Sequence, residues 1–236
     1  MRLIAIETAT EWCSVALWQD GESAALEARA GHRHAERVLP MIEQLLANAG
    51  GSIAQLDAIA FGAGPGSFTG LRVGCAIAQG LAYARDLPVL GVSTLEAMAE
   101  ESGASRVIAA LDARMREVYY AALEKLDGGW REVIAPACVV PERAPRPEGR
   151  DWTGCGNGFD VYRTALEGAL QEALRHCAPQ VRPSAIAVAR LAAPRLAAGE
   201  GADAALAAPV YVRDKVALTT SEQQRHQRPA SAASSR

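Results

Sequence analysis

The chain has 236 residues, half of them hydrophobic, and its 24 basic and 27 acidic side chains give a net charge of −3. This length and apolar content support one or two domains with a buried core, whereas the acidic balance excludes a protein that holds nucleic acid by charge alone. The first apolar run turns polar at Glu7, too early for a secretion signal, and no run reaches the ~20 residues of a membrane span.

The five cysteines are scattered and form no C-x-x-C pair. This usage is typical of reduced thiols, so we expect a cytoplasmic protein. The few aromatic residues do not alternate with Lys or Arg, which argues against a surface that stacks on bases.

The first hundred residues alternate between strand and helix patterns, which indicates an α/β fold. Residues 2–8 and 13–18 are apolar enough for paired strands, and Asp20-Gly21 then predicts a turn. The pattern further predicts a helix over 34–49, a buried strand over 57–62, a helix over 67–85 and a parallel strand in the PVLGV run.

The pattern starts again near residue 106. IAIETATEWCSVALWQDG and IAALDARMREVYYAALEKLDGG each contain a strand that ends at an acid (Glu7 or Asp112), a polar bend, a second strand and an Asp-Gly turn. Two α/β halves that each begin with a β-hairpin indicate the actin-like (ASKHA) fold; the alternative is a chance likeness of two hairpins. We expect subdomains over 1–104 and 105–217, a C-terminal helix able to pack back on the first, and a disordered tail over 218–236 that lacks large apolar side chains.

The segment FGAGPGSFTGLRVG, residues 61–74, is a glycine-rich loop that leads into a helix. No lysine follows before residue 85, which excludes a P-loop, and Thr69 stands where a dinucleotide-binding fingerprint needs glycine. Ser67 suits a helix N-cap, although amides at a helix N-terminus can also hold an anion. Both interpretations stay open on the sequence.

The helices predicted over 34–49 and 67–85 carry more apolar surface than one small domain needs. This excess predicts a protein interface. Gly70 and Gly74 would let a second helix approach closely, at ~1 kcal/mol each in helix propensity. The alternative is a helix enclosed within its own fold. The expected interface residues are Val38, Leu39, Met41, Ile42, Leu45, Gly70, Arg72, Val73, Gly74, Ile77 and Ala78.

Residue patterns for catalysis are scarce. The four histidines form neither H-E-x-x-H nor H-x-x-x-H, so we expect no zinc site. Cys155 has no evident histidine partner for a nucleophilic role. Glu7 and Asp112 could face a metal, but acids at strand ends as often bind backbone amides. We therefore expect no catalytic residue, no metal and no cofactor.

Several segments occur in the order and spacing of the TsaB (YeaZ) family, over residues 1 to about 217. They are IETATEWCSVAL, HAERVLPMI, AFGAGPGSFTGLRVGCAIAQGLA, PVLGVSTLEAMA, LDARMREVYYA and PVYVRDKVA. The resemblance implies an actin-like fold in two subdomains. It also implies a role with TsaD and TsaE in transferring threonylcarbamoyl from threonylcarbamoyl-adenylate to N6 of the adenosine beside the tRNA anticodon (t6A).

Within that resemblance the chain is expected to be a non-catalytic scaffold and activator of TsaD. It would form a heterodimer with TsaD, a homodimer when alone, and reach tRNA only through the complex. Where TsaD-like proteins carry a metal-binding H-x-x-x-H pair, this sequence has Thr94 and Met98, which cannot replace imidazole. The alternatives are an ATP-using or metallopeptidase-like enzyme of the same fold and a stand-alone homodimeric interaction protein.

Overall fold

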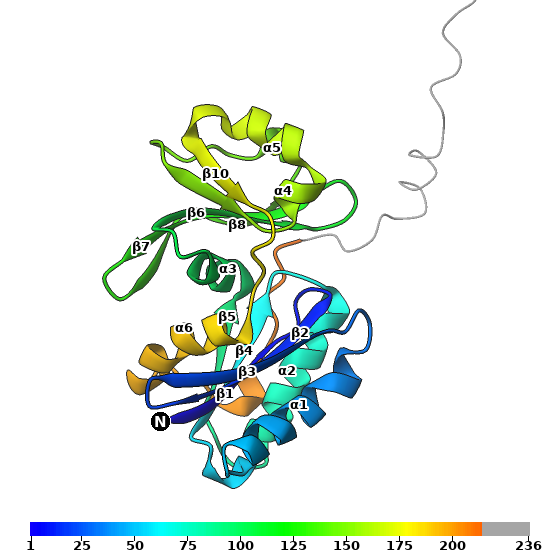
Figure 1. The fold of residues 1–236 in the computed structure, drawn as a ribbon, viewed down its shortest axis with the longest axis vertical. Helices are drawn as coiled ribbons and strands as arrows, with labels where there is room; N and C mark the ends of the chain where they lie inside the picture. The colour runs from blue at the N-terminus through cyan, green and yellow to red at the C-terminus, as the bar shows by residue number, and fades with distance from the viewer. Residues whose placement is uncertain (214–236) are drawn as a thin grey trace, which may run out of the picture.

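A computed structural model describes residues 1–213, which form two α/β units joined by a central helix (Figure 1). The first unit has a five-stranded sheet of order β3-β2-β1-β4-β5. The β1, β2 and β3 strands are antiparallel, and β1, β4 and β5 are parallel. The bounds are β1 Arg2–Glu7, β2 Trp12–Gln19, β3 Glu22–Arg29, β4 Ala58–Gly64 and β5 Val89–Ser93.

The second sheet repeats this arrangement as β8-β7-β6-β9-β10. Its first three strands are again antiparallel, and β6, β9 and β10 are again parallel. The same strand order and directions in both sheets confirm the duplicated, actin-like α/β fold. The bounds are β6 Arg106–Asp112, β7 Val118–Leu126, β8 Gly129–Val139, β9 Trp152–Cys155 and β10 Leu174–Ala178.

Helices cover both faces of the first sheet (Figure 1). On one face α1 (His34–Asn48) and α2 (Phe68–Tyr83) pack over Ile4 and Ile6, and on the other α6 (Ala185–Ala197) packs over Leu3 and Ala5. A central strand that is buried on both faces reads as a continuous apolar run. This arrangement explains why residues 2–8 are apolar without alternation.

Helix α3 (Thr94–Ser102) lies between the two sheets (Figure 1). Its Leu95, Met98 and Ala99 pack against β6 and β7 of the second unit in one buried cluster. The outer face of the second sheet is covered by α4 (Gly158–Val161) and α5 (Arg163–Leu170). Short 3₁₀ turns lie at η1 Ile53–Gln55, η2 Pro141–Arg143, η3 Gln171–Ala173 and η4 Ala204–Leu206.

The strands and helices expected in the first hundred residues are confirmed to within a few residues. Strand β3 was not expected. After β10 the chain returns to the first unit, so α6 belongs spatially to the first sheet although it lies within the expected 105–217 subdomain. The expected tail, 218–236, lies outside the described residues. Within residues 1–213, no helix is both long and apolar enough to cross a membrane.

Candidate functional site

The glycine-rich segment packs against the turn between β1 and β2. Ser67 caps α2, because its Oγ accepts a hydrogen bond from the Gly70 amide at 3.3 Å. The Ser67 amide donates to the Ala9 carbonyl at 2.7 Å, and Thr8 Oγ1 donates to the Gly70 carbonyl at 2.8 Å. Two amides that an anion would need at this helix N-terminus are therefore already bonded within the chain.

The glycines of this segment allow that turn to approach. A Cβ atom on Gly62 would collide with the Glu7 carboxylate, and one on Gly70 or Gly74 would collide with Thr8. Gly66 lies against Ala9 in the same way. Close approach does explain the glycines, but the approaching group is the β1–β2 turn of the same chain.

Glu7 is buried at the end of β1, with 1% of its surface exposed. Its Oε1 accepts a hydrogen bond from the Ala9 amide at 2.6 Å, whereas Oε2 has no partner among the described residues. Burial raises the pKa of Glu7 from 4.5 to about 7. Of the two interpretations for this acid, the bond to a backbone amide is the one observed.

Asp112, the matching acid of the second unit, is bound by two nearby residues, Arg114 and Tyr162. Its Oδ1 accepts hydrogen bonds from the Arg114 amide at 2.9 Å and from the Tyr162 hydroxyl at 3.2 Å. The Arg114 guanidinium lies 3.2 Å from Oδ2. Within residues 1–213, no three His, Cys, Asp or Glu side chains are grouped closely enough to hold a metal ion.

Thr94 and Met98, which stand at the expected histidine-pair positions, are both completely buried in α3. Met98 lies so close to Gly156, after β9, that a Cβ atom on this glycine would collide with the Met98 methyl group. Cys155 is also fully buried, and burial raises the pKa of its thiol. Because the thiolate is the reactive form, this thiol is a poor nucleophile. The contact region between α3 and the second unit, which we call the joint, is thus filled by core side chains.

The expected interface residues divide into two groups. Leu39, Arg72, Val73 and Ile77 are exposed or half-buried. The other seven, which are buried, are Val38, Met41, Ile42, Leu45, Gly70, Gly74 and Ala78. These seven face the interior of the first unit in the isolated chain: the aliphatic side chains pack on the first sheet, and Thr8 covers the two glycines.

A different side of α2 is exposed among residues 1–213. Thr69, Val73, Ala76, Gly80 and Tyr83 recur at helical spacing, and each is exposed or half-buried. We call these five residues the outer α2 face. Tyr83 is 77% exposed, and a Cβ atom on Gly80 would meet no described atom within 4 Å. The spacing of small residues signalled this face in the sequence, but periodicity does not tell which apolar side meets the sheet.

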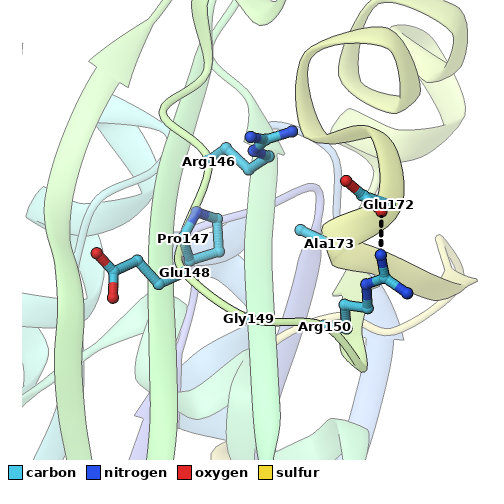
Figure 2. Close-up of a pocket in the computed structure, with 7 residues that line it drawn as sticks. All are labelled: Arg146, Pro147, Glu148, Gly149, Arg150, Glu172 and Ala173. Atoms are coloured by element: carbon cyan, nitrogen blue, oxygen red, sulfur yellow. Dashed lines mark hydrogen bonds and ion pairs between the residues drawn. The ribbon is translucent and has the colours of Figure 1, made fainter.

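A shallow pocket lies on the second unit, far from the glycine segment in sequence (Figure 2). Arg150 pairs with Glu172 across it, and Arg146 Nη1 donates a hydrogen bond to Gln171 at 3.1 Å. Its basic groups are thus engaged by neighbours, and no nucleophile or buried acid lines it. The lining residues are Arg146, Pro147, Glu148, Gly149, Arg150, Glu172 and Ala173.

Comparison with known proteins places this fold in one family. The family model for TsaD, tRNA N6-adenosine threonylcarbamoyltransferase, matches residues 28–221. The tRNA threonylcarbamoyladenosine biosynthesis protein TsaB of Escherichia coli K12 is 39% identical over 92% of this chain and 96% of its own length. TsaB of Haemophilus influenzae is 49% identical over 61% of this chain and 66% of its own length.

A solved structure agrees with these sequence matches. YeaZ from Pseudomonas aeruginosa is 40% identical and superposes with a TM-score of 0.82, covering 89% of this chain and 99% of that structure. The chain therefore belongs to the TsaD family and, within it, to the TsaB (YeaZ) proteins of tRNA threonylcarbamoyladenosine biosynthesis.

Proposed function

We propose that this protein acts in t6A formation as a non-catalytic scaffold and activator of TsaD, together with TsaE. The observation that carries the proposal is a contrast between two regions. The joint where TsaD-like proteins hold a metal contains the buried Thr94 and Met98, whereas α2 keeps an exposed face of small and apolar residues. A chain with a filled joint and an open helix face is suited to binding a partner.

Three ionisable groups support a non-catalytic role. The Glu7 carboxyl has a pKa of about 7 and bonds to the Ala9 amide, so much of it is protonated near neutral pH. A metal cation would have to displace this proton to bind the carboxylate. Asp112 is occupied by Arg114 and Tyr162, and the Cys155 thiol is inaccessible.

The outer α2 face supports the interface. The Ala76 and Gly80 positions are small enough for a second helix to pack at the usual 8–10 Å between axes. Tyr83 at the end of α2 and Phe68 at its start, which is 42% exposed, add aromatic area of the kind enriched at binding hot spots. Helices of a related fold in TsaD would complete the bundle, and a second copy of this chain would use the same surface when TsaD is absent.

The net charge of −3 fits a protein that reaches tRNA only through the complex. This complex would act in the cytoplasm. A reconstitution tests this role. Purified TsaD, TsaE, threonylcarbamoyl-adenylate and unmodified tRNA should form little t6A without this protein, and adding it should restore the reaction. Equal t6A formation with and without it, or steady ATP turnover by the isolated chain, would overturn the proposal.

A matched pair of variants tests the interface. Ala76→Glu places a charge on the outer α2 face, and Ala197→Glu places the same charge at an exposed position of α6 on the opposite side of the first sheet. We expect only Ala76→Glu to abolish TsaD binding and t6A formation, with both chains folded by circular dichroism. Normal TsaD binding by Ala76→Glu would place the interface elsewhere.

A further inference from the structure

The last described residues connect the two units. After α6, Ala202 pairs with Val89 at the edge of the first sheet, and η4 packs on α2. Residues 207–213, which we call the C-terminal strap, then run from the first sheet toward the second (orange in Figure 1). The proposed function uses none of these contacts.

The strap is attached to the first unit at the glycine-rich segment. The Val210 amide donates a hydrogen bond to the Ala63 carbonyl at 2.7 Å. The Val210 carbonyl oxygen would lie 2.6 Å from a Cβ atom on Gly64, so only glycine fits there. The Tyr211 ring lies 5.4 Å from that of Phe68, and its hydroxyl accepts a hydrogen bond from Arg72 Nε at 3.2 Å.

Arg213 attaches the strap to the second unit. Its guanidinium forms an ion pair with Glu117 and lies 5.9 Å from the Tyr119 ring centroid. Nη1 is 3.8 Å from the sulfur of Met115. Only 16% of the Arg213 side chain is exposed, so this pair is better shielded from solvent than an ordinary surface ion pair.

The turn that Arg213 contacts has a strained backbone. Arg114, Met115 and Arg116 have φ angles of 61°, 53° and 62°, three consecutive non-glycine residues in the left-handed region. Each costs about 1–2 kcal/mol, and such strain persists only where surrounding contacts hold it. The strap contacts Met115, in the middle of the strained stretch, and Glu117, directly after it.

The strap is too short to let its two attachment points move far apart. Val210 is bonded to the first unit and Arg213 to the second, and three residues of extended chain reach at most about 10 Å. Separation of the units at this edge would therefore break one attachment. We propose that the strap is a latch that fixes the relative orientation of the two units and holds the β6–β7 turn in its strained form.

Hydrogen exchange on two full-length variants tests the latch. Arg213→Ala removes the second-unit attachment, and we expect about fivefold faster exchange, the scale of one such contact, both in residues 113–118 and at the Val210 amide on the other unit. Val210→Pro removes the donor to Ala63 and should speed exchange in residues 113–118 in return. The coupling between the two ends is the signature of a latch, because a merely local contact would affect only its own unit.

Arg175→Ala is the matched control, because it breaks an exposed ion pair to Asp151 within the second unit. We expect no change in its exchange at Val210 or in residues 113–118. If Arg213→Ala fails to fold, Arg213→Lys keeps the charge but loses the planar fork, and the smaller increase should still appear at both ends. Faster exchange only at the end of the strap that carries the substitution, or no change in either variant, would overturn the proposal.

Discussion

The Glu7 carboxyl is a buried acid with one unsatisfied oxygen among the described residues. It ends a strand that is buried on both faces, and Gly62 on the neighbouring strand lies directly against it. One oxygen is satisfied by the Ala9 amide, and the other has no partner among residues 1–213. Burial disfavours the charged form, which is why the pKa rises to about 7.

We predict a pH-dependent stability that originates at Glu7. In the unfolded chain this group ionises near pH 4.5, whereas the folded chain keeps its proton up to about pH 7. Between these values the folded state binds the additional proton, so the free energy of unfolding falls as pH rises, by about 3 kcal/mol in total at pH 8. Chemical denaturation at pH 4 and pH 8 measures the change.

The Glu7→Gln variant isolates this contribution, because all other acids titrate equally in both chains. Glutamine keeps an oxygen for the Ala9 amide but cannot ionise. We expect its stability relative to the original chain to increase by about 3 kcal/mol between pH 4 and pH 8. A difference independent of pH would mean that Glu7 is ionised in the folded protein and has a partner.

At the scale of elements, α2 has two faces that resemble each other in composition but have different surroundings. Gly70 and Gly74 face the β1–β2 turn, where Thr8 leaves no space for a side chain. Gly80 lies on the outer α2 face, where a Cβ atom would meet no described atom within 4 Å. Glycine is thus required at the first two positions by contact with the chain itself, and not at the third.

Two alanine substitutions in α2 should therefore have opposite effects. Gly70→Ala forces a methyl group against the Thr8 backbone and should destabilise the fold by about 1–3 kcal/mol. Gly80→Ala meets open space and should stabilise it by up to ~1 kcal/mol through helix propensity. Thermal unfolding of the isolated chains compares them. Equal effects at both positions would mean that Thr8 does not set the requirement at Gly70.

The sequence allowed strong prediction where one element carries a complete pattern. The apolar runs of β1 and β4 and the periods of α1 and α2 identified these elements, because burial on one or two faces dictates their composition. Strand β3 was missed because ESAALEAR lies at an edge, is largely exposed and lacks strand-forming residues. The contact of Gly70 with Thr8 was also missed, because helix periodicity marks a crowded face without naming its neighbour.

At the scale of the whole molecule, sequence order and spatial units do not coincide. The chain crosses from the first unit to the second after α3 and returns after β10. On the return, Arg182 donates to Glu27 through Nε at 3.0 Å and stacks 4.1 Å over the Trp12 ring, both of the first sheet. Helix α6 then begins where the Ala185 amide donates to Ser14 Oγ at 3.1 Å. The sequence allowed for a C-terminal helix that packs back on the first subdomain, but composition alone did not identify α6 as that helix.

This return predicts that residues 1–104 do not fold alone. Without α6, one face of the first sheet, including Leu3, Leu90 and Val92, would be exposed to water. In the full chain α6 buries that face with Val188, Ala189 and their neighbours, which are completely buried. The lost burial is worth roughly 25 cal/mol for each Å² of apolar surface, a large part of the stability of a unit this small. We expect the 1–104 fragment to aggregate or unfold without cooperativity.

A rearranged chain provides the decisive comparison. Residues 183–206, joined to residues 1–104 through a flexible Gly/Ser linker of about 15 residues, restore α6 to the first sheet while keeping the same α3 as the fragment. We expect this chain to unfold cooperatively in a denaturant titration, with helical circular dichroism that the fragment lacks. The same chain carrying Ala189→Asp, which buries a charge against the sheet, should behave like the fragment. Cooperative unfolding of residues 1–104 alone would show that α6 is an accessory to the first unit, whereas recovery only with an intact α6 would make it part of that unit's core.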